Sequence, residues 1–356
     1  HKSIGFDINP VAKLITQTKT TAIKPKTLAN SRNKFLEYYE NTPSVSYNHH
    51  QRINYWFDEP TIQELDKIYF AIKKIKNHNV RRFFLCSFSH NLKNCSRWMM
   101  RDTKPTIDKD KILPIPKDTF LRHLDSMIKK NKLFYSTLAQ SGYINTHAKM
   151  YRRDSTKKLP IETKTINLII TSPPYVTSYE YADLHQLSLL WFGDDPKYFK
   201  KWHHFSNGFI EFRRNFVGTS SKKENIGDFN SVIAKQIVDD LIHTERPLAV
   251  DVANYFLDMK KVFSEMHRIL KTGGKACTII GNTKMRGVEI LNAQVAVEQM
   301  QAAGFKKVAF IKREIPNKKI TPWRDLESGK FTGKKNLPKT HSHAYEFEYV
   351  IVMEKV

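Results

Sequence analysis

The chain has 356 residues, of which 59 are Lys or Arg and 35 are Asp or Glu, so its formal net charge at pH 7 is +24. This length allows one large domain with an insertion, or two domains, and it excludes a small disulfide-stapled scaffold. An aromatic content of 12% excludes a disordered basic tail, because so many rings must be buried or stacked. The charge balance predicts a folded protein whose partner is a polyanion such as nucleic acid.

The three cysteines are Cys86, Cys95 and Cys277, and they form no CxxC pair and no metal-binding spacing. This pattern predicts a reducing, cytoplasmic location and no zinc site. No apolar run approaches the roughly 20 residues that cross a bilayer, and no signal-peptide pattern opens the chain. Residue His1 leads at once into "SIGFDINP", which is typical of the interior of a domain, so we expect native sequence upstream.

Residues 1–40 are predicted to begin with a short strand that ends at Asp7. A helix should follow from the Asn9-Pro10 pair, with Leu14 and Ile15 facing inward. Residues 41–145 change character, since apolar residues recur there at helical spacing with basic neighbours. The clearest examples are Leu65, Ile68, Ile72 and Ile75. We interpret this region as a mostly helical insertion.

Strand signals return in residues 146–356. The apolar run from Ile166 to Ile170 is typical of a strand buried on both faces. Residues 194–250 are basic and irregular, and the segments 197–216 and 218–225 are expected to be loops. The first of these loops interleaves basic and aromatic residues, which suits phosphate contact with base stacking, or equally a solvated loop with rings anchored in the core.

The last part of the chain alternates helices and strands. A helix with one apolar face should stop at Gly273-Gly274 and lead into a strand over 276–280. A helix near 291–303, a strand near 307–313 and a last strand, "FEYVIVME", should follow. Such alternation predicts a parallel sheet with helices on both faces, to which antiparallel strands can be added.

Three expected strand ends carry distinctive polar residues, namely Asp7, Asp154 and Ser172. Ligands of open α/β sheets bind at the carboxyl ends of strands. Asp7 can accept hydrogen bonds from ribose hydroxyls, or it can cap the following helix; Asp154 can equally be an ordinary turn residue. The Pro pair after Ser172 can simply stop a strand.

Taken in order, "IGFDINP", "RRDSTKKLP" and "TSPPY" resemble the second, third and fourth motifs of the amino-methyltransferase family of DNA methyltransferases. "MHRILKTGGKACTII" resembles the helix-Gly-Gly-strand unit common to class I methyltransferases. The resemblance covers residues 1–25 and 148–356. It implies an α/β fold with a Rossmann-like class I methyltransferase sheet, helices on both faces and a mostly helical insertion. Residues 1–40 and 146–356 would form the core, and 41–145 would recognise the target.

The resemblance also implies a cofactor, S-adenosyl-L-methionine, and a set of site residues. The implied catalytic residues are Ser172, Pro173, Pro174 and Tyr175. The implied cofactor-binding residues are Asp7, Asn9, Asp154 and Ser155. No metal is expected, and the pairs His49-His50, His203-His204 and His341/His343 are predicted to be surface or phosphate-contact histidines.

One feature departs from the family pattern. The Gly-rich cofactor loop should lie just upstream of "IGFDINP", yet none of the 13 glycines forms a GxG. The loop was left out of this sequence, or it belongs to a second polypeptide, or catalysis has been lost. We favour the first two, because a dead enzyme would have little reason to keep the whole Ser-Pro-Pro-Tyr segment.

The expected function is site-specific DNA methylation at an exocyclic base amine. Cytosine N4 is preferred because the fourth motif begins with Ser rather than Asp or Asn. The alternatives are adenine N6 methylation, RNA base methylation, and a non-catalytic DNA-binding subunit of a restriction or defence complex. DNA is the expected partner, and no membrane is involved.

Overall fold

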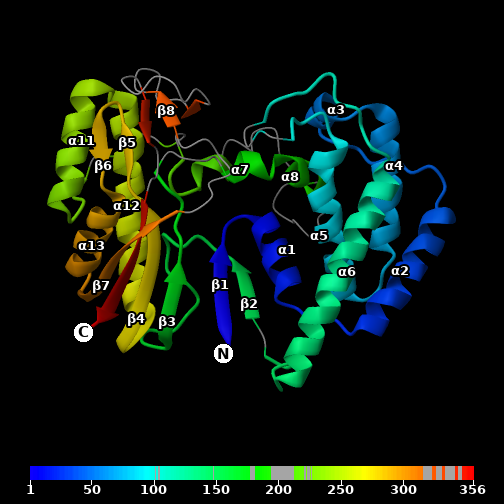
Figure 1. Ribbon diagram of the computed structural model, residues 1–356, viewed down its shortest axis with the longest axis horizontal. Helices are drawn as coiled ribbons and strands as arrows, with labels where there is room; N and C mark the ends of the chain where they lie inside the picture. Colours follow the sequence, from blue (N-terminus) through cyan, green and yellow to red (C-terminus); the bar gives the residue numbers. More distant parts are fainter. Residues whose placement is uncertain are drawn as a thin grey trace. The chain divides into compact units, whose positions relative to one another are not determined.

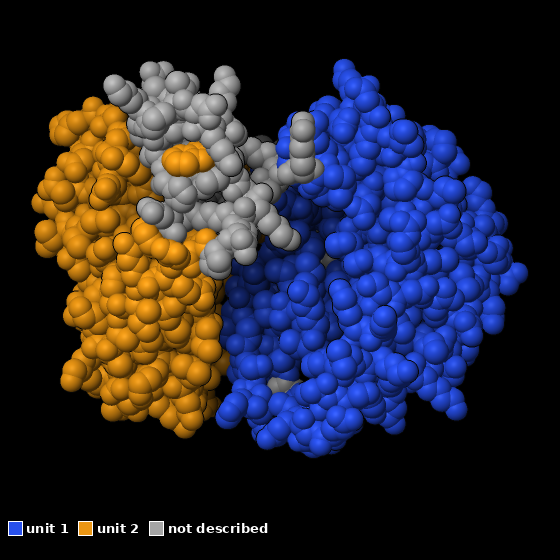
Figure 2. Space-filling model, viewed as in Figure 1, with its two compact units in different colours: residues 1–153, 181–212 blue, residues 154–180, 213–356 orange. Residues whose placement is uncertain are grey.

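The computed structural model describes residues 1–100, 102, 105–146, 148–176, 181–193, 212–219, 222, 225, 227–315, 323–325, 331–332, 341–343 and 347–356. The chain forms two compact units (Figure 2). Unit 1 contains residues 1–153 and 181–212, and unit 2 contains residues 154–180 and 213–356. Among the described residues, no helix is long and apolar enough to cross a membrane.

Unit 1 begins with the predicted β-to-α step. Strand β1 (Ser3–Asp7) pairs in parallel with β2 (Ala148–Arg152), so that Asp7 lies opposite Arg152. Helix α1 (Pro10–Lys19) starts where the sequence predicts, because Asn9 caps it and Pro10 occupies its first turn. Leu14 is buried as expected, whereas Ile15 is only partly buried.

The rest of unit 1 is helical (Figure 1). Its further helices are α2 (Pro25–Glu40), α3 (Arg52–Trp56), α4 (Glu59–Lys73), α5 (His78–Cys95), α6 (Pro116–Gln140), α7 (Tyr181–Leu184) and α8 (Gln186–Phe192). The predicted apolar face of α4 is buried, and α2, which precedes residue 41, packs against α4 and α6. Phe35, Phe84 and Phe120 bring α2, α5 and α6 together, with ring centroids 5.1 to 6.4 Å apart.

Unit 2 contains a four-stranded sheet in the order β3-β4-β11-β7. Its sheet strands are β3 (Ile166–Thr171), β4 (Leu270–Gly281), β7 (Phe305–Glu314) and β11 (Phe347–Lys355). Strands β3 and β4 run parallel, and β11 is antiparallel to both β4 and β7. The antiparallel addition to a parallel pair agrees with the expectation from the sequence.

Three helices complete the core of unit 2, namely α11 (Val232–Thr244), α12 (Arg246–Ile269) and α13 (Asn292–Ala302). Alternate residues of β4 and β11, such as Ala276, Ile280 and Ile351, are buried together with the apolar face of α12. The short strands are β5 (Thr283–Met285), β6 (Val288–Ile290), β8 (Trp323–Asp325), β9 (Phe331–Thr332) and β10 (His341–His343).

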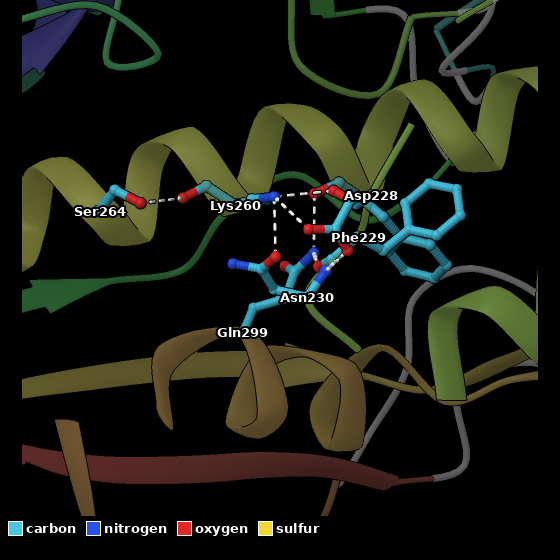
Figure 3. Close-up of polar contacts among 7 residues, drawn as sticks. Asp228, Phe229, Asn230, Lys260, Ser264 and Gln299 are labelled. Atoms are coloured by element: carbon cyan, nitrogen blue, oxygen red, sulfur yellow. Dashed lines mark hydrogen bonds and ion pairs between the residues drawn. The ribbon is translucent and has the colours of Figure 1, made fainter. Parts of the chain in front are cut away.

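Buried and exposed polar contacts anchor the segment that precedes α11. Lys260 on α12 donates hydrogen bonds from Nζ to Asp228 O at 2.8 Å and to Asn230 Oδ1 at 2.9 Å (Figure 3). Gln299 on α13 is buried, and its Nε2 donates to Phe229 O at 3.0 Å. These contacts hold residues 228–230 between two helices.

Three sequence predictions need correction. The strand β3 is not buried on both faces, because Leu168 and Ile170 are 54% and 67% exposed. The irregular region predicted over 194–250 is helical from Val232 onward, apart from the break at Glu245 between α11 and α12. The helix predicted to stop at Gly273-Gly274 already ends at Ile269, and both glycines lie in β4. Most of the loop predicted over 197–216 lies outside the described residues.

Candidate functional site

The Ser-Pro-Pro-Tyr segment follows the carboxyl end of β3 in unit 2. Ser172 is exposed, Pro173 is buried, and Pro174 and Tyr175 are partly buried. The first proline therefore fixes the backbone in the protein interior, while the Ser172 hydroxyl faces solvent. This arrangement presents a side-chain oxygen and a constrained backbone carbonyl next to each other.

Tyr175 approaches the backbone of two glycines very closely. An added Cβ at Gly281, the last residue of β4, would lie 3.3 Å from Cε2 of the Tyr175 ring. An added Cβ at Gly218 would lie 3.3 Å from the Tyr175 carbonyl oxygen, and Gly218 has a φ of +80°. Both positions therefore favour glycine, because a side chain there would displace Tyr175 or strain the backbone.

Asp7 and Asn9 form a connected set of hydrogen bonds in unit 1. Asp7 Oδ1 accepts from Asn9 N at 2.7 Å, and Asn9 Oδ1 accepts from Val11 N at 2.9 Å. The Asn9 amide nitrogen lies 2.8 Å from His185 Nδ1. Burial lowers the pKa of His185, so the neutral ring can accept this hydrogen bond from Asn9.

Burial also determines the state of Asp7. Desolvation raises the pKa of its carboxyl group, and hydrogen bonds from the backbone of Asn9 and Ile8 offset part of this rise. None of the ion pairs among the described residues involves Asp7. Asn9 is only 2% exposed and both ends of its amide have partners, so it can act on a ligand only by holding Asp7 in place.

Asp154 forms a local turn at the start of unit 2. Its Oδ1 accepts from Thr156 N at 2.9 Å and from Thr156 Oγ1 at 2.7 Å, and Lys157 Nζ lies 3.7 Å from Oδ2. Ser155 lies in the same turn and is partly buried. The turn interpretation of Asp154 thus accounts for its described contacts, although Oδ2 remains partly available.

The structure groups the predicted site residues into three sets. Asp7 lies with Asn9 in unit 1, Asp154 lies with Ser155 in unit 2, and the segment from Ser172 to Tyr175 forms the third set, also in unit 2. Sequence reasoning missed His185, Gly218 and Gly281. Their contacts to Asn9 and Tyr175 join residues far apart in the chain, so no local pattern signalled them.

Positive charge gathers in both units. In unit 1 the pKa of Lys13 is lowered, first by burial and then by Arg152, Arg82 and Arg153, so four cations lie near the end of the β1–β2 pair. In unit 2 a groove of about 510 Å³ is lined by α12 and by the turn after Asp154. Its charged residues are Lys157, Lys158, Lys260, Lys261, Glu265 and Arg268.

The histidine pairs do not all behave as predicted. His49 is not a surface residue: its Nε2 lies 2.7 Å from Oδ1 of Asp66, which is 1% exposed. His203 and His204 lie outside the described residues, as do the side chains of His341 and His343. Within the described part of the chain, no group of three or more His, Cys, Asp or Glu could hold a metal ion.

Comparison with known proteins finds sequence similarity to two methyltransferases. The chain is 23% identical over 341 residues to the Type II methyltransferase M.MvaI of Kocuria varians, covering 89% of this chain and 73% of that protein. It is 23% identical over 176 residues to the Type II methyltransferase M.BsoBI of Geobacillus stearothermophilus, covering 42% of this chain and 33% of that protein. No protein-family model matches the chain.

Among solved structures, the chain is similar to a proposed DNA modification methylase from Thermus thermophilus, TTHA0409, in a complex with S-adenosyl-L-methionine. The identity is 12%, the TM-score is 0.24, and the similarity covers 55% of this chain and 50% of that one.

Proposed function

We propose that this protein transfers a methyl group from S-adenosyl-L-methionine to an exocyclic amine of a DNA base. The observation that carries the proposal is the Ser172–Tyr175 segment at the carboxyl end of the parallel strand β3, with an exposed hydroxyl and a buried proline. Ligands of open α/β sheets bind at such strand ends. Similarity to two Type II methyltransferases supports the same conclusion.

The segment suits activation of a base amine. The lone pair of such an amine is delocalised into the ring, which makes it a poor nucleophile. If the Ser172 hydroxyl and the Pro173 carbonyl accept hydrogen bonds from the amine, the nitrogen becomes more tetrahedral and its lone pair can attack in line. The Tyr175 ring, held against Gly281, would offer a face on which an extruded base stacks.

S-adenosyl-L-methionine would supply the methyl group as part of a sulfonium. Asp7 suits the ribose end, because its carboxylate lies at the end of a parallel strand and has no ion-pair partner among the described residues. Asn9 would hold Asp7, and Asp154 with Ser155 would border the adenine. Of these four residues, Asp154 has the most competing local contacts.

The proposed site needs a further strand and its Gly-rich loop. Within the described residues, β3 pairs only with β4, so its other edge is open. Leu168 and Ile170, which lie on one face of the strand, are exposed as well. An open, apolar strand edge is a template for another strand. We infer that a strand from an upstream segment, or from a second polypeptide, pairs there and carries the loop for the methionine end of the cofactor.

DNA would be held by the cationic groups of both units, and the helical region 41–145 would recognise the target sequence. The Lys13 cluster is the stronger candidate for phosphate contact, because the charged groups that lower the pKa of Lys13 are all cations. The groove with Lys157 and Lys260 is a second candidate, although both lysines lie near carboxylates, those of Asp154 and Asp228. The basic and aromatic residues of the segment 197–216 would add contacts.

Product analysis tests the proposal and its preferred base. The protein, complemented with the missing strand and loop, would be incubated with isotopically labelled cofactor and either duplex DNA or a transcript of the same sequence, and the product digested to nucleosides. We expect labelled N4-methylcytosine from DNA. Labelled N6-methyladenine would reassign the base, and label in the transcript alone would favour an RNA methyltransferase.

A non-catalytic DNA-binding subunit is the second candidate, and the absence of a GxG among the 13 glycines favours it. Such a subunit would bind DNA as tightly as the enzyme but would incorporate no label under any complementation. The same assay therefore separates the two functions.

A further inference from the structure

Unit 1 contains a cavity that the proposed methyl transfer does not use. Its volume is about 600 Å³, and its walls come from α1, α5, α6 and the α7–α8 segment. This volume is within the range of pockets that bind small organic molecules. Asp7 and Asn9 do not line the cavity, although His185, the hydrogen-bond partner of Asn9, does.

The walls are mainly apolar and aromatic. Phe83, Trp98, Met127 and Phe134 line the cavity, and Phe83 and Trp98 are only 4% and 1% exposed. The imidazoles of His90 and His123 also line it, stacked with ring centroids 3.9 Å apart and an interplanar angle of 11°. Flat side chains of this kind favour a flat ligand, because rings gain most contact when they stack or pack edge to face.

The charged residues of the lining all have the same sign. Lys19, Lys93 and Lys130 line the cavity, whereas no Asp or Glu does. Lys93 Nζ donates to two backbone carbonyls, Asp102 O at 2.8 Å and Met100 O at 3.3 Å, and the nearby charge of Asp102 partly offsets the lowering of its pKa by burial. An anionic ligand would complement this lining.

The cavity lining also includes hydrogen-bond donors. The indole Nε1 of Trp98 is buried and has no hydrogen-bond partner among the described residues. A buried donor without an acceptor is costly, and a bound ligand could supply the acceptor. Partial burial, with His90 and Lys130, lowers the pKa of His123 to about 4, and the pKa of His90 is lowered as well. Both rings are therefore neutral at pH 7 and can each donate one N–H.

We propose that this cavity binds a small planar aromatic anion, with its ring between the aromatic walls and its acidic group beside Lys130. Two sources share this chemistry, namely a nucleoside monophosphate and an aromatic carboxylic acid. The proposal does not depend on the methyltransferase activity, because none of the proposed catalytic or cofactor-binding residues lines the cavity.

The test uses 8-anilinonaphthalene-1-sulfonate, a fluorescent planar anion, as the probe. We expect one molecule to bind per chain. Lys130→Gln should weaken binding about tenfold, on the scale of one charge-assisted contact. The matched control is Lys132→Gln on the same helix, since Lys132 is exposed and does not line the cavity; it should change the affinity less than about twofold.

A second variant fills the cavity without changing its charge. Met127→Trp should weaken probe binding at least about tenfold, because the larger side chain takes up space that the ring needs. Thermal unfolding would verify that each variant is folded, and Lys130→Gln keeps the test valid if Met127→Trp does not fold. Equal affinities for Lys130→Gln and Lys132→Gln, or several probe molecules per chain, would overturn the proposal.

Competition identifies the source of the ligand. Displacement of the probe by adenosine 5′-monophosphate but not by 2-naphthoate indicates a nucleotide, and the reverse indicates an aromatic acid; either result supports the proposal. Displacement by neither compound overturns it. Displacement by duplex DNA alone would also overturn it, by making the cavity part of a nucleic-acid surface.

Discussion

At the scale of single residues, burial of the charged Asp7 carboxylate destabilises the fold, and the same carboxylate is proposed to bind the cofactor. Its carboxyl pKa is raised by desolvation, and the charged form is held in place by backbone N–H groups and the Asn9–His185 contact. Residues that bind ligands commonly retain such costs. Stability and cofactor affinity should therefore respond in opposite directions to a change at this position.

Asp7→Asn should raise the melting temperature at pH 7. Since the folded-state pKa is raised, protonated Asp7 stabilises the fold fully below the unfolded-state pKa of about 3.9, and this contribution is lost as pH rises through the folded-state pKa. The neutral amide of Asn avoids that loss, so the increase in melting temperature relative to the wild type should become smaller toward pH 4. Thermal melts of the variant and the wild type at pH 7 and at pH 4 measure this difference.

The control for this prediction is Asp110→Asn, which removes the same charge from an exposed position and should leave the melting temperature nearly unchanged. A lower melting temperature for Asp7→Asn than for the wild type at pH 7 would show instead that the ionised carboxylate stabilises the fold.

Residue-level prediction from the sequence worked where a local pattern existed. The start of α1 was predictable because the Asn-Pro pair is a local signal for a helix start. His185 and Gly281 were not predictable, because their contacts join residues 176 and 106 positions apart, to Asn9 and Tyr175 respectively. The depth of burial of His49 was also missed, since its partner Asp66 lies 17 positions further along the chain, on α4.

At the scale of elements, periodicity identified the helices with one apolar face and the strands that alternate with them. The faces of α4 and α12 and the strand β11 confirm those predictions. The exposure of β3 was wrongly predicted, because a continuous apolar run cannot reveal whether other elements cover both faces of the strand. Residues 232–250 were mistaken for irregular chain because they were grouped with the basic segment before them, although the apolar residues of α11 recur at helical spacing.

One buried amide on α13 links this helix to α12 and to the segment that precedes α11. Gln299 Nε2 donates to Phe229 O at 3.0 Å and to Phe256 O at 2.9 Å. Gln299→Leu should lower the free energy of unfolding by about 1 to 3 kcal/mol, because it leaves two buried carbonyls with fewer partners. Urea unfolding followed by circular dichroism measures the change.

The matched substitution is Gln301→Leu, on the same helix but exposed, which should change the free energy of unfolding by less than about 0.5 kcal/mol. If both substitutions have the same effect, the Gln299 contacts do not stabilise the packing of these helices.

At the scale of the whole molecule, the excess of cations over anions determines how DNA binding should depend on salt. With a formal net charge of +24, the chain is expected to neutralise several phosphates. Affinity for duplex DNA should then fall about 100-fold or more between roughly 50 and 200 mM salt, mostly independently of sequence. Fluorescence anisotropy at several salt concentrations checks this, and a flat dependence would exclude DNA as the main partner.

The open edge of β3 leads to a second prediction at this scale. The 356-residue chain alone should bind S-adenosyl-L-methionine weakly, because its described residues provide the ribose contact but no Gly-rich loop for the methionine end. Adding the missing strand and loop should restore binding, and Asp7→Ala should then weaken it. Calorimetric titration compares the preparations; tight binding by the chain alone would mean that the cofactor site is built elsewhere.

The central claim is that the Ser172–Tyr175 segment holds the base amine during methyl transfer, and turnover by a Ser172→Ala variant tests it most directly. The measurement is incorporation of labelled methyl groups into saturating DNA by the complemented protein. The control is Thr244→Ala, since Thr244 is exposed and its Oγ1 donates within its own helix to Asp240 O at 3.0 Å. We predict a fall of about 100-fold or more for Ser172→Ala, the scale of one positioned catalytic group, with DNA affinity and Thr244→Ala turnover unchanged. Normal turnover by Ser172→Ala would contradict this claim and reduce the segment to a turn that ends β3.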